Sequence, residues 1–174
     1  MTEEEIAELW ENDRYTRLVT VPVALTKHRC SKELAVTVIS EMLPVWRVSD
    51  ETDDLINLAR FGNDEDLDKL MYNKQRWGWR VREAVALRGR DEDLEILVAD
   101  PEPEVRAAVA RVGRDKDLDR LVYDPNDFVR YAVAWQGRED DLDILVHDTN
   151  TDVALTARTQ LHKQKSLDKA QNKK

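Results

Sequence analysis

The sequence VREAVALRGRDEDLEILVADPEPE occupies residues 81–104, and the next two blocks of equal length repeat its pattern. They read VRAAVARVGRDKDLDRLVYDPNDF at 105–128 and VRYAVAWQGREDDLDILVHDTNTD at 129–152. A fixed period of this kind is typical of repeat proteins, in which each unit buries its apolar face only by stacking on its neighbours. The three blocks therefore predict an all-α solenoid.

Each block is predicted to contain two helices. In the second block, Val105 and Val109 lie four residues apart on one face of a first helix of about 9–11 residues. Gly113 ends that helix, and Leu118 and Leu121 are the inward residues of a second helix. The second helix spans only about six or seven residues, so it could be either α-helical or 3₁₀.

Residues 49–72 are a less regular copy of the same pattern, in which Gly62 is predicted to close the first helix in a left-handed turn. We expect a single solenoid domain over 1–161. Within it, 1–48 form degenerate or capping repeats with an N-terminal capping helix over 3–12, and 49–161 form the regular repeats. Residues 162–174 are expected to be a mobile basic tail, because they hold five lysines against one aspartate.

The pattern D-P-x-x-x-V-R-x-A-V-A, which runs from Asp124 to Ala134, resembles the first helix of HEAT-like repeats. The short period is similar to that of the leucine-rich repeat variant type, which pairs an α-helix with a 3₁₀ helix. The resemblance implies a right-handed α-solenoid that presents a surface to a macromolecule. Some relatives carry an iron–sulfur cluster, but this chain has only Cys30, so the cluster is not carried over. A few are DNA glycosylases, and no motif here supports that activity.

Composition narrows the classes of function. The chain has 174 residues, 36% of them charged, with a formal net charge of -9, which argues against non-specific binding to DNA or anionic membranes. We expect a cytoplasmic protein without a signal peptide or membrane span. We also expect no cofactor, metal or enzymatic activity. The three histidines lie far apart, and the sequence contains no phosphate-binding loop, metalloprotease motif or paired-cysteine motif.

Two series of arginines recur with the period, and acidic triplets follow the second series. One interpretation is structural: the arginines bond the carbonyl ends of first helices and the carboxylates of adjacent repeats. The other is a striped surface that offers acidic side chains to a basic partner or arginines to phosphates. Because acid always lies near the arginines, the acidic surface is the stronger of these two. The candidate residues are Arg82, Arg106 and Arg130 with Asp91, Asp115 and Asp140.

Aromatic residues that depart from the repeat form a second set of candidates. The segment 74–82, KQRWGWRVR, which contains three residues inserted between repeats, combines arginine and tryptophan, the residue types that dominate binding hot spots. Tyr131 and Trp135 replace Ala107 and Arg111 of the preceding block and share one helix face. Both groups could instead serve packing. The candidates in the segment 74–82 are Arg76, Trp77, Trp79, Arg80 and Arg82.

Three functions remain open from the sequence. The first is a non-enzymatic protein–protein interaction module, a scaffold or an inhibitor. Its acidic surface would mimic nucleic acid and block a basic protein, as a phage-encoded inhibitor would. The second is a nucleic-acid-binding protein that uses the basic-aromatic segment 77–82 and the lysine-rich tail. The third is a HEAT-like enzyme that acts on nucleic-acid bases. A protein partner is therefore expected, with nucleic acid as the alternative.

Overall fold

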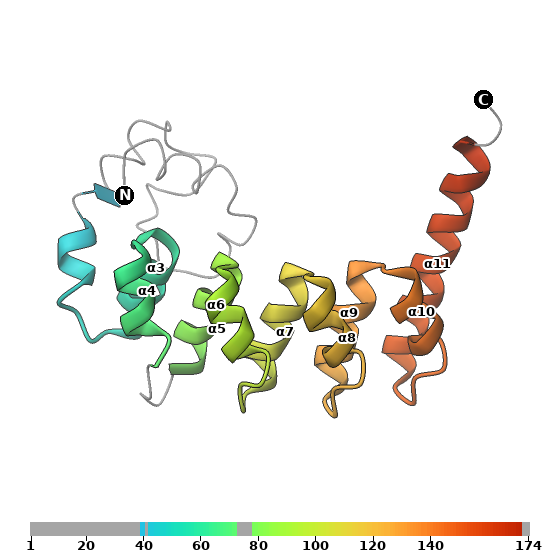
Figure 1. Ribbon diagram of the computed structural model, residues 1–174, viewed down its shortest axis with the longest axis horizontal. Coiled ribbons are helices and arrows are strands. Elements are labelled where there is room, and N and C mark those ends of the chain that lie inside the picture. Colours follow the sequence, from blue (N-terminus) through green and yellow to red (C-terminus); the bar gives the residue numbers. More distant parts are fainter. Residues whose placement is uncertain (1–38, 41, 73–77, 172–174) are drawn as a thin grey trace. The chain divides into compact units, whose positions relative to one another are not determined.

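The computed structural model describes residues 39–40, 42–72 and 78–171, and all the regular secondary structure within these ranges is helical (Figure 1). This part of the chain is compatible with the α-solenoid that the period predicts. The capping helix expected over 3–12 lies outside the described residues, as does most of 1–48. The chain divides into two compact units, residues 1–88 and 89–174.

The first unit contains three labelled helices, α3 (Thr52–Phe61), α4 (Asp64–Leu70) and α5 (Gly78–Arg88). The α3 helix packs against α5, and the short α4 helix packs against both. Trp46, from the helical residues that precede α3, stacks on Phe61 with ring centroids 6.2 Å apart. The core of this unit is closed by buried apolar side chains, including Ile56, Leu58, Leu67, Leu70, Val81 and Val85.

The second unit alternates short and long helices. They are α6 (Asp91–Leu97), α7 (Pro103–Val112), α8 (Asp115–Leu121), α9 (Asp127–Gln136), α10 (Glu139–Leu145) and α11 (Thr151–Gln171). The long helices α7, α9 and α11 pack side by side. Each of the short helices α8 and α10 packs against the long helix before it and the long helix after it (Figure 1). The unit is therefore a stack of two layers with one apolar interior between them.

The period explains which side chains fill that interior. Val105 and Val109 of α7 are fully buried, and so are their equivalents in α9. Leu118 and Leu121 of α8 close the core from the other layer. The second helices are α-helices of seven residues, which decides between the two alternatives left by the sequence.

The C-terminal segment that the sequence predicts to be a basic tail is helical over most of its length. The α11 helix continues through residues 162–171 as one helix of 21 residues. The physical reason lies at Leu161, which stands where the preceding repeats have a helix-ending glycine, so no residue there stops the helix. Residues 172–174 lie outside the described part of the chain.

The predicted left-handed turn at Gly62 is wrong. Gly89, Gly113 and Gly137 have φ angles between 77° and 82°, but Gly62 has φ -70° and ψ 169°. Space, not backbone conformation, requires glycine at this position. A Cβ atom on Gly62 would lie 2.4 Å from the carbonyl oxygen of Leu58 and 2.8 Å from Cβ of Asp66.

The positive φ at Gly137 and the lack of space at Gly62 predict different changes in stability when asparagine replaces the glycine. Gly137→Ala should lower the free energy of unfolding by about 1 kcal/mol, and Gly137→Asn by less, because asparagine tolerates positive φ. Its nearest neighbour, Nε2 of Gln164, lies 3.5 Å from the added Cβ, so crowding is minor. At Gly62 alanine and asparagine should be equally harmful, because both carry the clashing Cβ. Urea denaturation of the four variants tests this, and rescue of Gly62 by asparagine would contradict the steric explanation.

Candidate functional site

The arginines that follow the core valines bind the start of the next repeat. Nε and Nη2 of Arg130 donate to the two carboxylate oxygens of Asp148 at 2.6 and 2.9 Å, and Nη1 donates to the carbonyl oxygens of Asp124 and Pro125. Arg106 makes the same set of bonds one repeat earlier, with the carboxylate of Asp124 at 2.7 and 2.9 Å. Each guanidinium group therefore links two successive turns.

These carbonyl partners differ from the prediction that the arginines would bond the carbonyl ends of first helices. The carbonyl groups belong to the turn that precedes each first helix, at Asp124-Pro125 for Arg130 and at Asp100-Pro101 for Arg106. Long side chains on a helix point back toward its N-terminus. An arginine near the start of a helix therefore reaches the preceding turn and not the far end of a helix.

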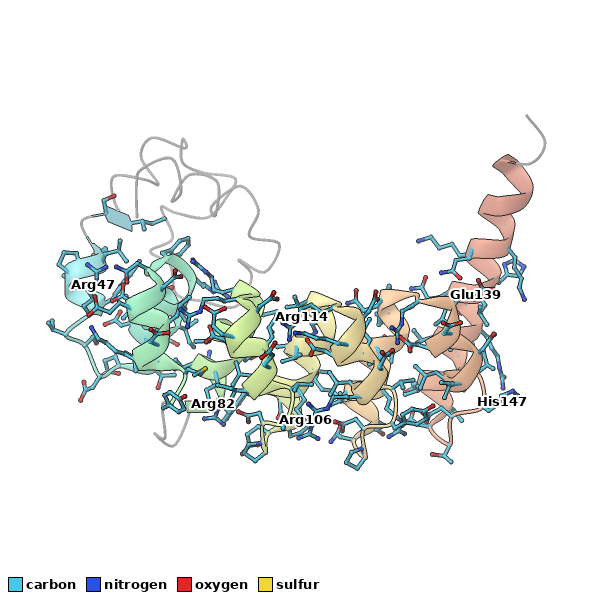
Figure 2. All side chains as sticks on the ribbon, viewed as in Figure 1. Arg47, Arg82, Arg106, Arg114, Glu139 and His147 are labelled. Carbon is cyan, nitrogen blue, oxygen red and sulfur yellow. The ribbon has the colours of Figure 1, made fainter. Side chains whose placement is uncertain are left out.

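The arginines that follow the glycines bind the acidic triplets. Arg114 pairs with Asp117 at 2.6 Å and with Asp91 of the preceding repeat at 2.8 Å. Arg138 pairs likewise with Asp141 at 2.6 Å and with Asp119 at 2.5 Å (Arg114 is labelled in Figure 2). The third acid of each triplet is thus buried and structural. Of the predicted acidic surface, Asp91, Asp115 and Asp140 are exposed.

The first unit reaches the same arrangement with a residue from outside the repeat. Asp66 is buried like the third acid of the later triplets, but Asn63 stands where those repeats have arginine. Asn63 and Asp66 cap α4 reciprocally, and Arg47 supplies the guanidinium group, with Nη2 2.8 Å from Asp66 Oδ2. The hydrogen bond from Arg47 lowers the pKa of Asp66. Asn63 is the sequence signal that could have predicted this contact, because without an arginine at position 63 Asp66 needs a basic partner from outside the repeat.

The basic-aromatic segment 74–82 is only partly described. Arg76 and Trp77 lie outside the described residues. Trp79, Arg80 and Arg82 are half-buried on α5, and Nη1 of Arg80 lies 3.6 Å from Asp53. The described residues of this segment therefore do not form an exposed basic surface.

Tyr131 and Trp135 lie together on α9, as their spacing predicts, and Phe128 extends the same face. The rings of Tyr131 and Trp135 meet edge to face with centroids 6.3 Å apart. Trp135 is 57% exposed and Phe128 is 42% exposed. The guanidinium carbon of Arg111, from α7, lies 5.3 Å from the centroid of the Phe128 ring. We call Phe128, Tyr131 and Trp135 the aromatic row. Sequence reasoning missed Phe128, although it replaces the acids Glu104 and Asp152 of the neighbouring repeats.

A groove of about 470 Å³ lies between α9 and α11 beside the aromatic row. Its charged lining residues are the two acids Asp127 and Asp152, and none of its described lining residues is basic. Leu155 of α11, which is 62% exposed, forms part of the apolar lining. The complete lining is Asp127, Phe128, Tyr131, Asn150, Asp152, Val153, Leu155 and Thr156.

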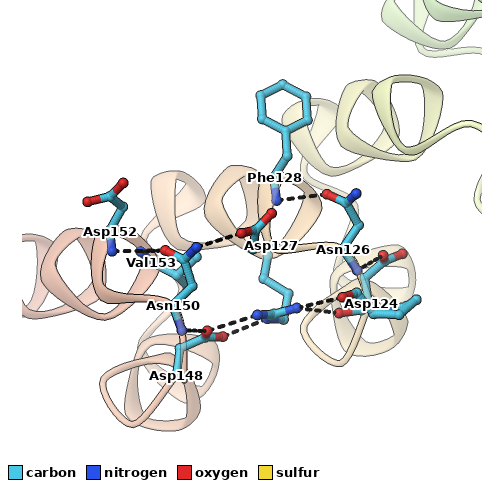
Figure 3. A network of polar contacts seen from close by, with 10 residues as sticks. Asp124, Asn126, Asp127, Phe128, Asp148, Asn150, Asp152 and Val153 are labelled. Atoms are coloured by element: carbon cyan, nitrogen blue, oxygen red, sulfur yellow. Dashed lines mark hydrogen bonds and ion pairs between the residues drawn. The ribbon is translucent and has the colours of Figure 1, made fainter.

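A chain of hydrogen bonds orients this groove (Figure 3). Asp148, which is bound by Arg130, accepts a bond from the backbone N–H of Asn150 at 2.8 Å. The Asn150 side chain then accepts from the N–H groups of Asp152 and Val153 at the start of α11, and it donates to Asp127 Oδ2 at 2.5 Å. Both acids of the groove are therefore held at fixed helix starts.

Arg130→Lys should test the link between repeats. Lysine keeps the charge but cannot form the two-pronged contact with Asp148 while also bonding two carbonyl groups. We expect the free energy of unfolding to fall by about 1–3 kcal/mol, measured by urea denaturation. Arg158→Lys is the control, because Arg158 is exposed and Nη2 donates to the single carbonyl of Val146. Equal losses in the two variants would contradict the linking role.

The same contact predicts a dependence on pH. The hydrogen bond from Arg130 lowers the pKa of Asp148 below its ordinary value of 3.8. A carboxyl group whose pKa is lower in the folded state stabilises the fold above its unfolded pKa, and this stabilisation is lost as pH falls through the folded pKa. The free energy of unfolding should therefore decline below about pH 4. Asp148→Asn should make that decline shallower, and an unchanged slope would refute the assignment.

No protein-family model, curated protein or solved structure matches this chain. Among residues 39–40, 42–72 and 78–171, no helix is long and apolar enough to cross a membrane. The same ranges contain no group of three histidine, cysteine or acidic side chains placed to hold a metal ion.

Proposed function

We propose that this protein is a non-enzymatic protein–protein interaction module that binds a basic protein through the face formed by α9 and α11. The observation that carries the proposal is the exposed aromatic row beside a groove whose charged lining residues are acidic. Aromatic side chains supply much of the binding energy at protein interfaces. Carboxylates at the edge of such a surface select partners of opposite charge.

The aromatic row is not required by the scaffold. The preceding repeat places Ala107 and Arg111 where α9 has Tyr131 and Trp135, and it builds an equally buried core. Trp135 and Phe128, which lie on one helix face, both leave apolar surface in contact with water. Contiguous apolar surface of this kind marks interaction sites. The departure from the repeat is therefore better explained by a partner than by packing.

The charges favour a basic partner over nucleic acid. Phosphate binding needs lysine or arginine that is not already neutralised. Arg106 and Arg130, two of the predicted candidates, are each held by a carboxylate and by two carbonyl groups. Among the exposed first and middle acids of the triplets, Asp140 adds to the acidic surface, whereas Asp91 is paired with Arg114 and Asp115 lies 3.6 Å from Arg138. An acidic surface of this kind would let the protein act as a scaffold for a basic partner or as an inhibitor that imitates nucleic acid.

We also propose a finer classification of the fold. The D-P-x-x-x-V-R-x-A-V-A pattern supports a right-handed, HEAT-like solenoid related to the leucine-rich repeat variant type. The seven-residue α-helices depart from the 3₁₀ helix of that type. A chain with a single cysteine needs no oxidising compartment, which supports a cytoplasmic protein.

The test begins with the identification of proteins that the full chain captures from its native cells, followed by titration of the purified partner. Tyr131→Ala and Trp135→Ala should each weaken binding about tenfold or more, as hot-spot residues do. Ile96→Ala is the control, because Ile96 is an exposed apolar residue on α6, one of the short helices. It should change the affinity less than about twofold.

Salt gives an independent check of the charge argument. Affinity for a basic partner should fall as the salt concentration rises from about 0.05 to 0.3 M, because screening weakens attraction between exposed charges. Combined Glu139→Gln and Asp140→Asn changes, at two exposed acids of the triplet in α10, should weaken binding and flatten this dependence. The third acids of the triplets must be left intact, because they are buried against arginines. An affinity that salt does not change, or a partner that is DNA or RNA, would contradict the proposal.

A further inference from the structure

We propose that the groove between α9 and α11 binds an arginine side chain of the partner. This inference rests on the proposed function and names the chemical group that the groove recognises. The groove combines the rings of Phe128 and Tyr131 with the carboxylates of Asp127 and Asp152. A guanidinium group is the protein side chain that suits both, because it stacks on aromatic faces and pairs with carboxylates through a planar fork.

The protein already places an arginine on one of these rings. The guanidinium carbon of Arg111 lies 5.3 Å from the centroid of Phe128, within the range of cation–π contacts. The Phe128 ring also lines the groove, so its surroundings suit a delocalised cation. The volume of about 470 Å³ exceeds the needs of one side chain, and it leaves space for the backbone that carries it.

The helix starts at the groove do not favour an anion. The N-terminal N–H groups of a helix ordinarily attract phosphates or carboxylates. Here the N–H of Phe128 donates to Asn126, and those of Asp152 and Val153 donate to Asn150. The cap bonds thus occupy these three donors, and the charged groups that the helix starts present are Asp127 and Asp152.

Asp127 keeps capacity for a second donor. Asn150 donates to its Oδ2 atom, and a carboxylate has about four acceptor positions. The bond from Asn150 holds the carboxylate in place, so the partner's arginine would meet an oriented acceptor. A second hollow, of about 410 Å³, adjoins the groove and shares Asp127 and Asn150 with it. The backbone of an extended segment could continue there, beside Arg130, whose guanidinium is already bonded.

The test is an NMR titration of the isotope-labelled full chain with the peptide acetyl-Gly-Arg-Gly-amide. The same peptide with citrulline, which has nearly the shape of arginine but no charge, is the matched probe. We expect the arginine peptide to shift the signals of Phe128, Tyr131, Leu155 and Thr156, and the citrulline peptide to bind about tenfold more weakly. Equal binding of both peptides, or shifts confined to other residues, would overturn the inference.

Asp152→Asn should weaken binding of the arginine peptide about fivefold, because it removes charge and leaves the shape of the groove unchanged. Asp143→Asn, on the exposed surface of α10, removes the same charge elsewhere and should leave binding unchanged. If a purified basic partner binds wild type and Asp152→Asn alike and the peptide does not bind, the arginine groove is refuted while the proposed function stands. If the peptide binds in the groove but no basic protein binds the chain, the groove is supported and the proposed function fails.

Discussion

The second unit depends on the contact between the arginine that follows each core valine, Arg106 or Arg130, and the aspartate of the next turn. A buried ion pair adds little net stability, because desolvation offsets most of the attraction, but loss of one partner leaves a buried charge unpaired. The contact is important because its geometry fixes how neighbouring helices align. Arg130 bonds the turn before its own helix and the turn before the next, so it fixes the register of α9 against α11. The geometry of the groove depends on this register, because Asp148, held by Arg130, positions Asn150.

The scaffold also explains why so many charges leave an acidic surface. The buried aspartates Asp93, Asp117, Asp124 and Asp141 each engage an arginine that a nucleic-acid-binding protein would have kept for phosphates. Other acids remain in the first turns of the short helices, where the helix dipole favours them. A regular series of arginines is therefore compatible with an acidic exterior, and their periodicity argues for structure more than for recognition.

The period predicted the buried valines and leucines well, because apolar spacing and burial are both local properties of a repeat. It could not predict Arg47, which pairs with Asp66 from 19 residues away and outside the repeated pattern. It also failed at Gly62, because the carbonyl group of Leu58 lies beside Gly62 only in the folded structure. Tyr131 and Trp135 were identified as departures from the pattern. The groove was not predicted, because it combines Asp152 and Leu155 of α11 with residues of α9, and the pattern within one repeat does not show which side chains of two helices meet.

The groove depends on small departures from the repeat that coincide at one helix pair. Asn150 can bond Asp127, whereas Asn126 in the preceding repeat would meet Pro103, which has no side-chain acceptor. Phe128 stands where α7 has Glu104, and Leu155 stands where α7 has Ala107. The equivalent face of α7 therefore has neither the aromatic ring nor the oriented carboxylate. Since all three repeats bury the same core, stability alone would not select these differences, and recognition of a partner at α9 and α11 would.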